Sequence, residues 1–202
     1  LRKALAGVEG GQFVGLIIDV RSNPGGLLRT TVEVTDEFLD SGIVLIERDA
    51  DGNTQTFGAF SGGVATNIPI VIIQNAASAS GAEVLAAALA DNDRATIIGT
   101  RSFGKGTVNQ LRELKSCGDP AGCGALYVSV GRWLRPSGEE IEGLGIRPDI
   151  VVAMTGDNYI KSGDLQVFAA IDVLRGDELP PPPASDNLEE EAVEVEGGSS
   201  EE

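Results

Sequence analysis

The sequence predicts an α/β fold, because apolar strands and helices alternate along the chain. Apolar runs rich in Ile and Val predict buried strands, the clearest being FVGLIIDV at 13–20 and PIVIIQ at 69–74. The alanine-rich stretch AEVLAAALADN at 82–92 is the clearest helix. Strands that alternate with helices in this way are typical of the α/β class.

The remaining elements are predicted from apolar periodicity and turn residues. The stretch LLRTTVEVTDEFL has helical spacing and predicts a helix over 27–39, which ends before Gly42. The segment DADGN at 49–53 predicts a hairpin turn. Further strands are expected at 43–47, 54–59, 95–98, 107–113 and 125–130, and a last helix at 164–175.

The carboxyl-terminal end differs in composition from the rest of this 202-residue chain, whose net charge is −16. Four prolines, Pro180 to Pro183, favour an extended spacer. The segment from Asp186 to Glu202 has eight acidic residues and no basic residue, and we expect it to be disordered. We therefore expect a folded core over 1–178 and a tail over 179–202. The start at Leu1 suggests a fragment or a processed form.

Missing residue types narrow the possible chemistry. The chain has no histidine, which excludes Ser–His–Asp and Cys–His mechanisms and zinc sites that need histidine. A general base must then be a carboxylate, a tyrosine or one of the four lysines. The negative charge argues against binding to nucleic acid or to an anionic membrane surface. No apolar run is long enough to span a membrane, and we expect no cofactor and no metal.

Two cysteines, Cys117 and Cys123, flank a stretch rich in glycine and proline, CGDPAGC. Two thiols alone are too few for a zinc site, and a catalytic thiol would have no histidine to activate it. Two interpretations remain open: free thiols in a loop, or a small disulfide that closes the loop in an exported protein.

Three loops rich in glycine or small residues follow apolar strands, at 21–26, 75–81 and 99–106. Loops at the carboxyl ends of strands usually build the site in α/β proteins. Ser80 lies just before the alanine-rich helix, where a serine often caps the helix. The same position suits a nucleophile, because the N–H of Gly81 and the helix dipole would stabilise an oxyanion.

Lys105 lies between two glycines, which let the third loop pass close to another segment. A lysine acts as a general base only when burial or a nearby cation destabilises its charged form. The stretch from Gly99 to Lys105 also matches the first seven positions of a nucleotide-binding P-loop. The eighth position should be Ser or Thr but is Gly106, and the following TVNQLREL alternates like a strand, which argues against nucleotide binding.

Five motifs together resemble one family, the carboxyl-terminal processing peptidases, also called tail-specific proteases. They are RSNPGG at 21–26, SASGAE at 78–83, FGKG at 103–106, PSG at 136–138 and GIRPD at 145–149. The resemblance implies a serine endopeptidase with a Ser–Lys dyad.

In that family pattern Ser80 is the nucleophile and Lys105, 25 residues later, is the general base. The second glycine of RSNPGG, Gly26, would supply an oxyanion-hole N–H together with Gly81. A base that works only when neutral implies activity that rises with pH.

The resemblance covers about residues 1–175 and implies a ClpP- or crotonase-like spiral of mixed strands and helices. It also implies protein substrates, cleaved near unstructured carboxyl-termini with apolar end residues. The expected location is extracytoplasmic: the periplasm, the cell envelope or outside the cell.

The sequence departs from the family in two respects. The family has a Gln that orients the lysine, whereas this chain has Asn109 at that position and Gln110 next to it, so either amide is a candidate. The PDZ module and the amino-terminal helical region that precede the family's catalytic core are absent from this sequence. These departures motivate one alternative, a non-catalytic relative that acts as a scaffold or peptide-binding module. A second alternative is an acyl-CoA-handling protein of similar fold, because two oxyanion N–H groups after strands would suit that chemistry too.

Overall fold

The computed structural model describes residues 1–8, 13–114 and 124–177, so the cysteine pair and the acidic tail lie outside the described residues. The strands are β1 (Leu16–Asp19), β2 (Ile43–Asp49), β3 (Thr54–Gly58), β4 (Ile70–Gln74), β5 (Ala95–Gly99), β6 (Thr107–Glu113), β7 (Ala125–Leu134) and β8 (Ile150–Val151). The helices are α1 (Arg2–Leu5), α2 (Leu28–Asp36), α3 (Gly81–Asp91), α4 (Gly156–Ser162) and α5 (Leu165–Arg175).

A parallel sheet with the strand order β1-β4-β5-β8 carries the loops singled out in the sequence. Asp19 pairs with Ile73 and Gln74 pairs with Gly99, so the carboxyl ends of β1, β4 and β5 lie side by side. The three loops that follow these strands therefore leave the same edge of the sheet, which is where α/β proteins place their sites.

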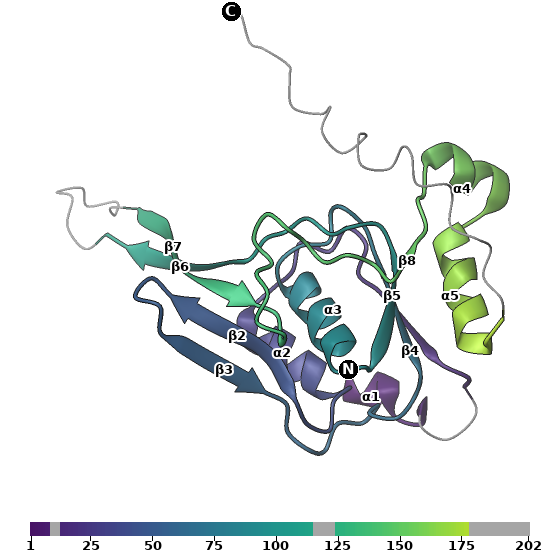
Figure 1. Cartoon of the computed structure of the whole chain (residues 1–202), viewed down its shortest axis with the longest axis horizontal. Helices are drawn as coiled ribbons and strands as arrows, with labels where there is room; N and C mark the ends of the chain where they lie inside the picture. Colours follow the sequence, from purple (N-terminus) through teal and green to yellow (C-terminus); the bar gives the residue numbers. More distant parts are fainter. Residues whose placement is uncertain (9–12, 115–123, 178–202) are drawn as a thin grey trace, which may run out of the picture.

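An antiparallel sheet with the order β3-β2-β7-β6 lies across α3 from the parallel sheet (Figure 1). Strand β6 is one of its two edge strands and begins two residues after Lys105. The pairing of β6 with β7 shifts register between Val108 and Asn109, an irregularity of the kind found near functional sites.

Both faces of the parallel sheet are covered, as the apolar character of β4 requires. Ile70 and Ile72 belong to the core cluster shared with α3, whereas Val71 and Ile73 pack with Ala170 of α5 on the other face. Figure 1 shows α3 between the two sheets and α5 on the far side of β4 and β5.

The predicted α/β class and the mixed spiral of strands and helices are confirmed. Most predicted elements are present with ends shifted by a few residues. Strand β7 runs to Leu134 instead of ending near 130, because its second half pairs with β2, a long-range contact that the local sequence does not encode. The short helices α1 and α4 were not predicted. Within the described ranges no helix has the length and apolar content needed to cross a bilayer.

Candidate active site

Ser80 is placed at the amino-terminal end of α3 with a strained backbone. Its φ is 55°, a left-handed value that a non-glycine residue rarely adopts and that often marks functional positions. Its backbone N–H donates to the Glu83 carboxylate (N to Oε2, 2.8 Å). The residue is half-buried, so its side chain has access to the surface at the start of the helix.

The glycines of loop 21–26 lie directly against Ser80 and Gly81. A Cβ added to Gly25, whose φ is +94°, would lie 2.6 Å from the Gly81 nitrogen and 2.8 Å from the Ser80 Cβ. A Cβ added to Gly81 would lie 3.2 Å from the Gly26 nitrogen. The backbones of loop 21–26 and of the start of α3 can approach this closely only because Gly25 and Gly81 lack side chains. The Gly26 nitrogen consequently lies beside Gly81.

Hydrogen bonds fix loop 21–26 to loop 75–81. The Ala79 N–H donates to the Asn23 carbonyl (2.9 Å), and the Ser22 N–H donates to the Asn75 side-chain oxygen (2.9 Å). The Ser78 hydroxyl donates to the Val20 carbonyl at the end of β1 (2.8 Å). These bonds set the position of the glycines relative to Ser80.

Glu83 joins the nucleophile loop to loop 99–106 and was not singled out from the sequence. Its carboxylate is fully buried and accepts four hydrogen bonds. Oε2 accepts from the N–H groups of Ser80 and Lys105, both at 2.8 Å, and Oε1 accepts from the Ser102 hydroxyl and the Gly104 N–H, both at 2.6 Å. The pattern Ser-x-x-Glu at a helix start, typical of a capping box, was the available signal.

Lys105 is thereby held next to Ser80. Both backbone nitrogens bind the same Glu83 oxygen at 2.8 Å, so they lie no further apart than twice that distance. Lys105 is half-buried, and within the described part of the chain its amino group has no hydrogen-bond or ion-pair partner. The neighbouring Gly106 N–H donates to Glu142 (2.7 Å), which fixes the far end of the loop.

Among the described residues, neither candidate amide hydrogen-bonds the Lys105 side chain. Asn109 accepts from the Ser129 hydroxyl (2.7 Å) and donates to the Thr107 hydroxyl (3.3 Å). Gln110 is exposed and is the next residue of β6, so it faces the opposite side of the sheet. Of the two amides, only the Asn109 side chain is fixed by hydrogen bonds within the described ranges.

A hollow of about 170 Å³ opens beside Gly26 and Gly81. Leu27, Val34 and Leu85 contribute apolar side chains to its lining. Because it adjoins the two glycine N–H groups, it could take an apolar side chain of an extended peptide.

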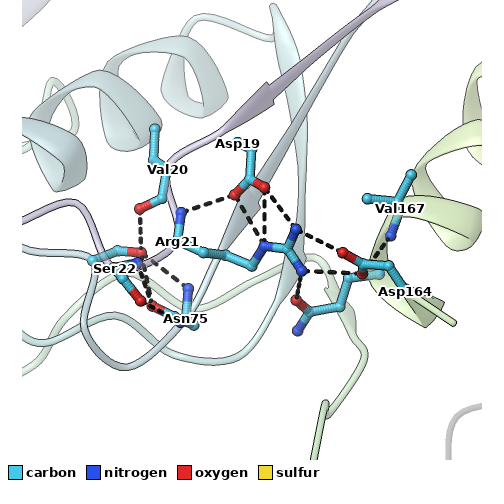
Figure 2. Close-up of polar contacts among 9 residues, drawn as sticks. Asp19, Val20, Arg21, Ser22, Asn75, Asp164 and Val167 are labelled. Atoms are coloured by element: carbon cyan, nitrogen blue, oxygen red, sulfur yellow. Dashed lines mark hydrogen bonds and ion pairs between the residues drawn. The ribbon is translucent and has the colours of Figure 1, made fainter. Parts of the chain in front are cut away.

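Arg21, at the start of the RSNPGG loop, is bound to two carboxylates (Figure 2). Its guanidinium lies between Asp19 at the end of β1 and Asp164 at the start of α5, with nearest distances of 2.6 Å and 2.8 Å. Hydrogen bonds to Asp19 and Asp164 raise the pKa of Arg21. The hydrogen bond from Arg21 lowers the pKa of Asp164; burial raises the pKa of Asp19, but Arg21 outweighs burial and lowers it.

The segment that resembled a P-loop does not form one. Loop 99–106 is followed by β6, whereas a P-loop opens a helix that points its N–H groups at phosphate. The strand predicted after this loop is present, and it argues against a nucleotide-binding P-loop here.

Comparison with known proteins identifies relatives of this chain. The family model described as "Peptidase family S41" matches residues 1–152. A "Carboxy-terminal-processing protease" of Bartonella bacilliformis is 43% identical over 139 residues, which cover 68% of this chain and 31% of that protein. A "Carboxyl-terminal-processing protease" of Synechocystis is 37% identical over 165 residues, covering 80% of this chain and 37% of the relative.

Solved structures give the same result. The photosystem II D1 C-terminal processing protease superposes with a TM-score of 0.68 and 32% identity, over 75% of this chain and 38% of that chain. Mature CPAF has the same fold, with a TM-score of 0.68 at 16% identity. This chain spans about a third of the length of the curated relatives it matches. On the family match and these identities, the chain belongs to peptidase family S41.

Proposed function

We propose that this chain is the catalytic part of a serine endopeptidase in which Ser80 and Lys105 form the dyad. The observation that carries the proposal is the shared Glu83 oxygen, which holds the backbones of Ser80 and Lys105 together beside Gly26. Of the two candidate amides, we propose that Asn109 supports the dyad indirectly through β6, because it hydrogen-bonds Ser129 and Thr107 and not Lys105.

The reaction follows from these positions. The neutral amine of Lys105 takes the proton of the Ser80 hydroxyl as its oxygen attacks the peptide carbonyl. The N–H groups of Gly26 and Gly81 donate to the oxyanion that forms. The Lys105 ammonium then gives its proton to the leaving amine, and water hydrolyses the acyl-enzyme with Lys105 again as base.

The substrate is an extended protein segment with an apolar residue beside the cleaved bond. The apolar hollow next to Gly26 and Gly81 supports this, because it adjoins the carbonyl position. The relatives are named for carboxyl-terminal processing, which supports cleavage near an unstructured carboxyl-terminus. By the same likeness we place the protein outside the cytoplasm, with residues 1–178 as the catalytic core.

Cleavage of casein by the whole chain, followed from pH 6 to 10, tests the proposal. We expect Ser80→Ala and Lys105→Ala to abolish cleavage while circular dichroism shows them folded. Ser137→Ala and Lys161→Ala remove an exposed serine and an exposed lysine and should leave cleavage unchanged. A fluorophosphonate probe should label Ser80 in the unmodified chain, located by peptide mass spectrometry.

The alternative is a non-catalytic relative that binds peptides, motivated by Asn109 in place of the family's glutamine. A folded chain that neither cleaves casein nor reacts with the probe at Ser80 would favour this alternative. Cleavage that survives in Ser80→Ala would contradict the assignment of Ser80 as the nucleophile.

A further inference from the structure

The guanidinium of Arg21 binds side chains at the end of β1 and at the start of α5. Its Nε and Nη2 bind Asp19 (3.0 Å and 2.6 Å), and Nη1 and Nη2 bind Asp164 (3.0 Å and 2.8 Å). Nη1 also donates to the side-chain oxygen of Gln166 (3.1 Å). All three guanidinium nitrogens take part in these contacts, a planar arrangement that the single ammonium group of a lysine cannot reproduce.

The amino-terminal turn of α5 is also linked, through Val152, to β5, the strand that precedes loop 99–106. Gln166 is buried, and its amide nitrogen donates to the Val152 carbonyl (2.7 Å). The Val152 N–H in turn donates to the carbonyl of Gly99 at the end of β5 (2.9 Å). The start of α5 is therefore linked to the start of loop 21–26 directly through Arg21, and to the start of loop 99–106 indirectly through Val152.

Loop 21–26 needs such an anchor because its conformation is strained. Ser22 has a φ of 56°, which persists only when the surroundings determine it. Asn75 and Ala79 hold the inner side of the loop. Without the positive charge of Arg21, the carboxylates of Asp19 and Asp164 would face each other and repel, separating the loop from α5.

We propose that Arg21 is a positioning residue that transmits the placement of α5, through Asp164 and Gln166, to the Gly26 N–H of the oxyanion hole. The proposal rests on the proposed peptidase function. Asp164 and Gln166 lie beyond residues 1–152, which the family model matches. In this chain α5 is therefore part of the catalytic geometry and not only a cover for the sheet.

Asp164 also caps α5, since its side chain accepts from the Val167 N–H (3.2 Å), and the two roles must be separated. Asp164→Ser keeps a good capping residue but removes the paired oxygens that bind Arg21. Arg21→Lys keeps the positive charge but removes the planar guanidinium that binds both carboxylates. Arg29→Lys is the matched control, because it makes the same change in an exposed i,i+4 pair with Glu33.

Peptide cleavage kinetics on the whole chain give the first readout. We expect Arg21→Lys and Asp164→Ser to lower kcat about ten- to one-hundredfold, since the Gly26 donor is displaced from the oxyanion. KM should stay within about twofold, because ground-state binding is not affected. Arg29→Lys should match the unmodified chain. The positioning role would be overturned if the fraction of folded protein fell as much as the activity, or if KM changed while kcat did not.

Amide hydrogen exchange gives a second readout that does not need activity. The Ser22 and Gly25 N–H groups donate to Asn75 and Asn23 and should exchange faster in both variants but not in Arg29→Lys. Unchanged exchange over 22–26 would overturn the inference. If the unmodified chain fails to cleave or to label at Ser80, the peptidase proposal fails, and the exchange result still decides whether α5 positions the loop.

Discussion

The loops that bring Lys105 and Gly26 to Ser80 are held by opposite means. Loop 99–106 is tied from the interior by Glu83, whose buried carboxylate accepts four hydrogen bonds. Loop 21–26 is tied at its outer end by Arg21, whose side chain is 21% exposed. Removing a buried acceptor leaves unpaired donors, whereas water can replace a partly exposed ion pair. The lysine loop should therefore fail together with the fold, and the glycine loop should loosen within an intact fold.

The largest effect is expected at Glu83. Glu83→Ala would leave the Ser102 hydroxyl and three backbone N–H groups unpaired in the interior. We expect a loss of at least about 3 kcal/mol in the free energy of unfolding, measured by urea denaturation, together with loss of cleavage.

Glu83→Gln sharpens the same test. Each carboxylate oxygen accepts from at least one backbone N–H, so an amide NH₂ at either place would oppose a fixed donor. We expect this variant to unfold at higher urea than Glu83→Ala but to cleave far more slowly than the unmodified chain. Unimpaired cleavage by Glu83→Gln would show that the lysine loop does not depend on the carboxylate.

A smaller effect is expected at Asn75, which holds the inner side of loop 21–26. Its side-chain oxygen accepts from the N–H groups of Ser22 and Ala77. Asn75→Ala should cost about 1–2 kcal/mol of stability and lower kcat about tenfold. Asn75→Asp keeps the acceptor and should retain most of both. Equal losses in the two variants would contradict the role of this oxygen.

The two candidate amides of β6 should differ. Asn109→Ala removes the hydrogen bonds to Ser129 and Thr107 and should reduce kcat/KM several-fold, about the effect of one polar contact. Gln110→Ala changes an exposed side chain and should have no measurable effect. A larger loss in Gln110→Ala would transfer the supporting role to that residue.

The smallest effect is expected in how the stability of the fold falls at acid pH, where the carboxylates that pair with Arg21 become protonated. Asp19 and Asp164 have pKa values lowered below their ordinary 3.8 in the folded chain. Their contribution is therefore present above that value and is lost as pH falls through the lowered pKa values. Because both groups are partly exposed, we expect no more than about 1 kcal/mol.

Thermal unfolding from pH 7 to pH 3 measures this contribution. Asp164→Ser should unfold with a shallower loss of stability below about pH 4 than the unmodified chain. An identical slope in both proteins would mean that the pair with Arg21 contributes nothing to stability.

The sequence was sufficient for the strands and helices with strong periodicity, such as 69–74 and 82–92, and for the residue types of the site. It was not sufficient for the second half of β7, whose strand character depends on pairing with β2. It also left open the choice between Asn109 and Gln110, because adjacent residues of a strand point to opposite faces and the sequence does not say which face of β6 meets the lysine loop.

By itself, the sequence determined which chemistry is available. The absence of histidine, the motifs around Ser80 and Lys105, and the glycines of three loops are properties of residue types and spacing. Only the tertiary structure decided that Glu83 joins two loops and that Arg21 binds Asp164, 143 residues away. Such contacts leave no periodic signal in the sequence, because they arise when parallel strands bring distant chain segments to one edge of a sheet.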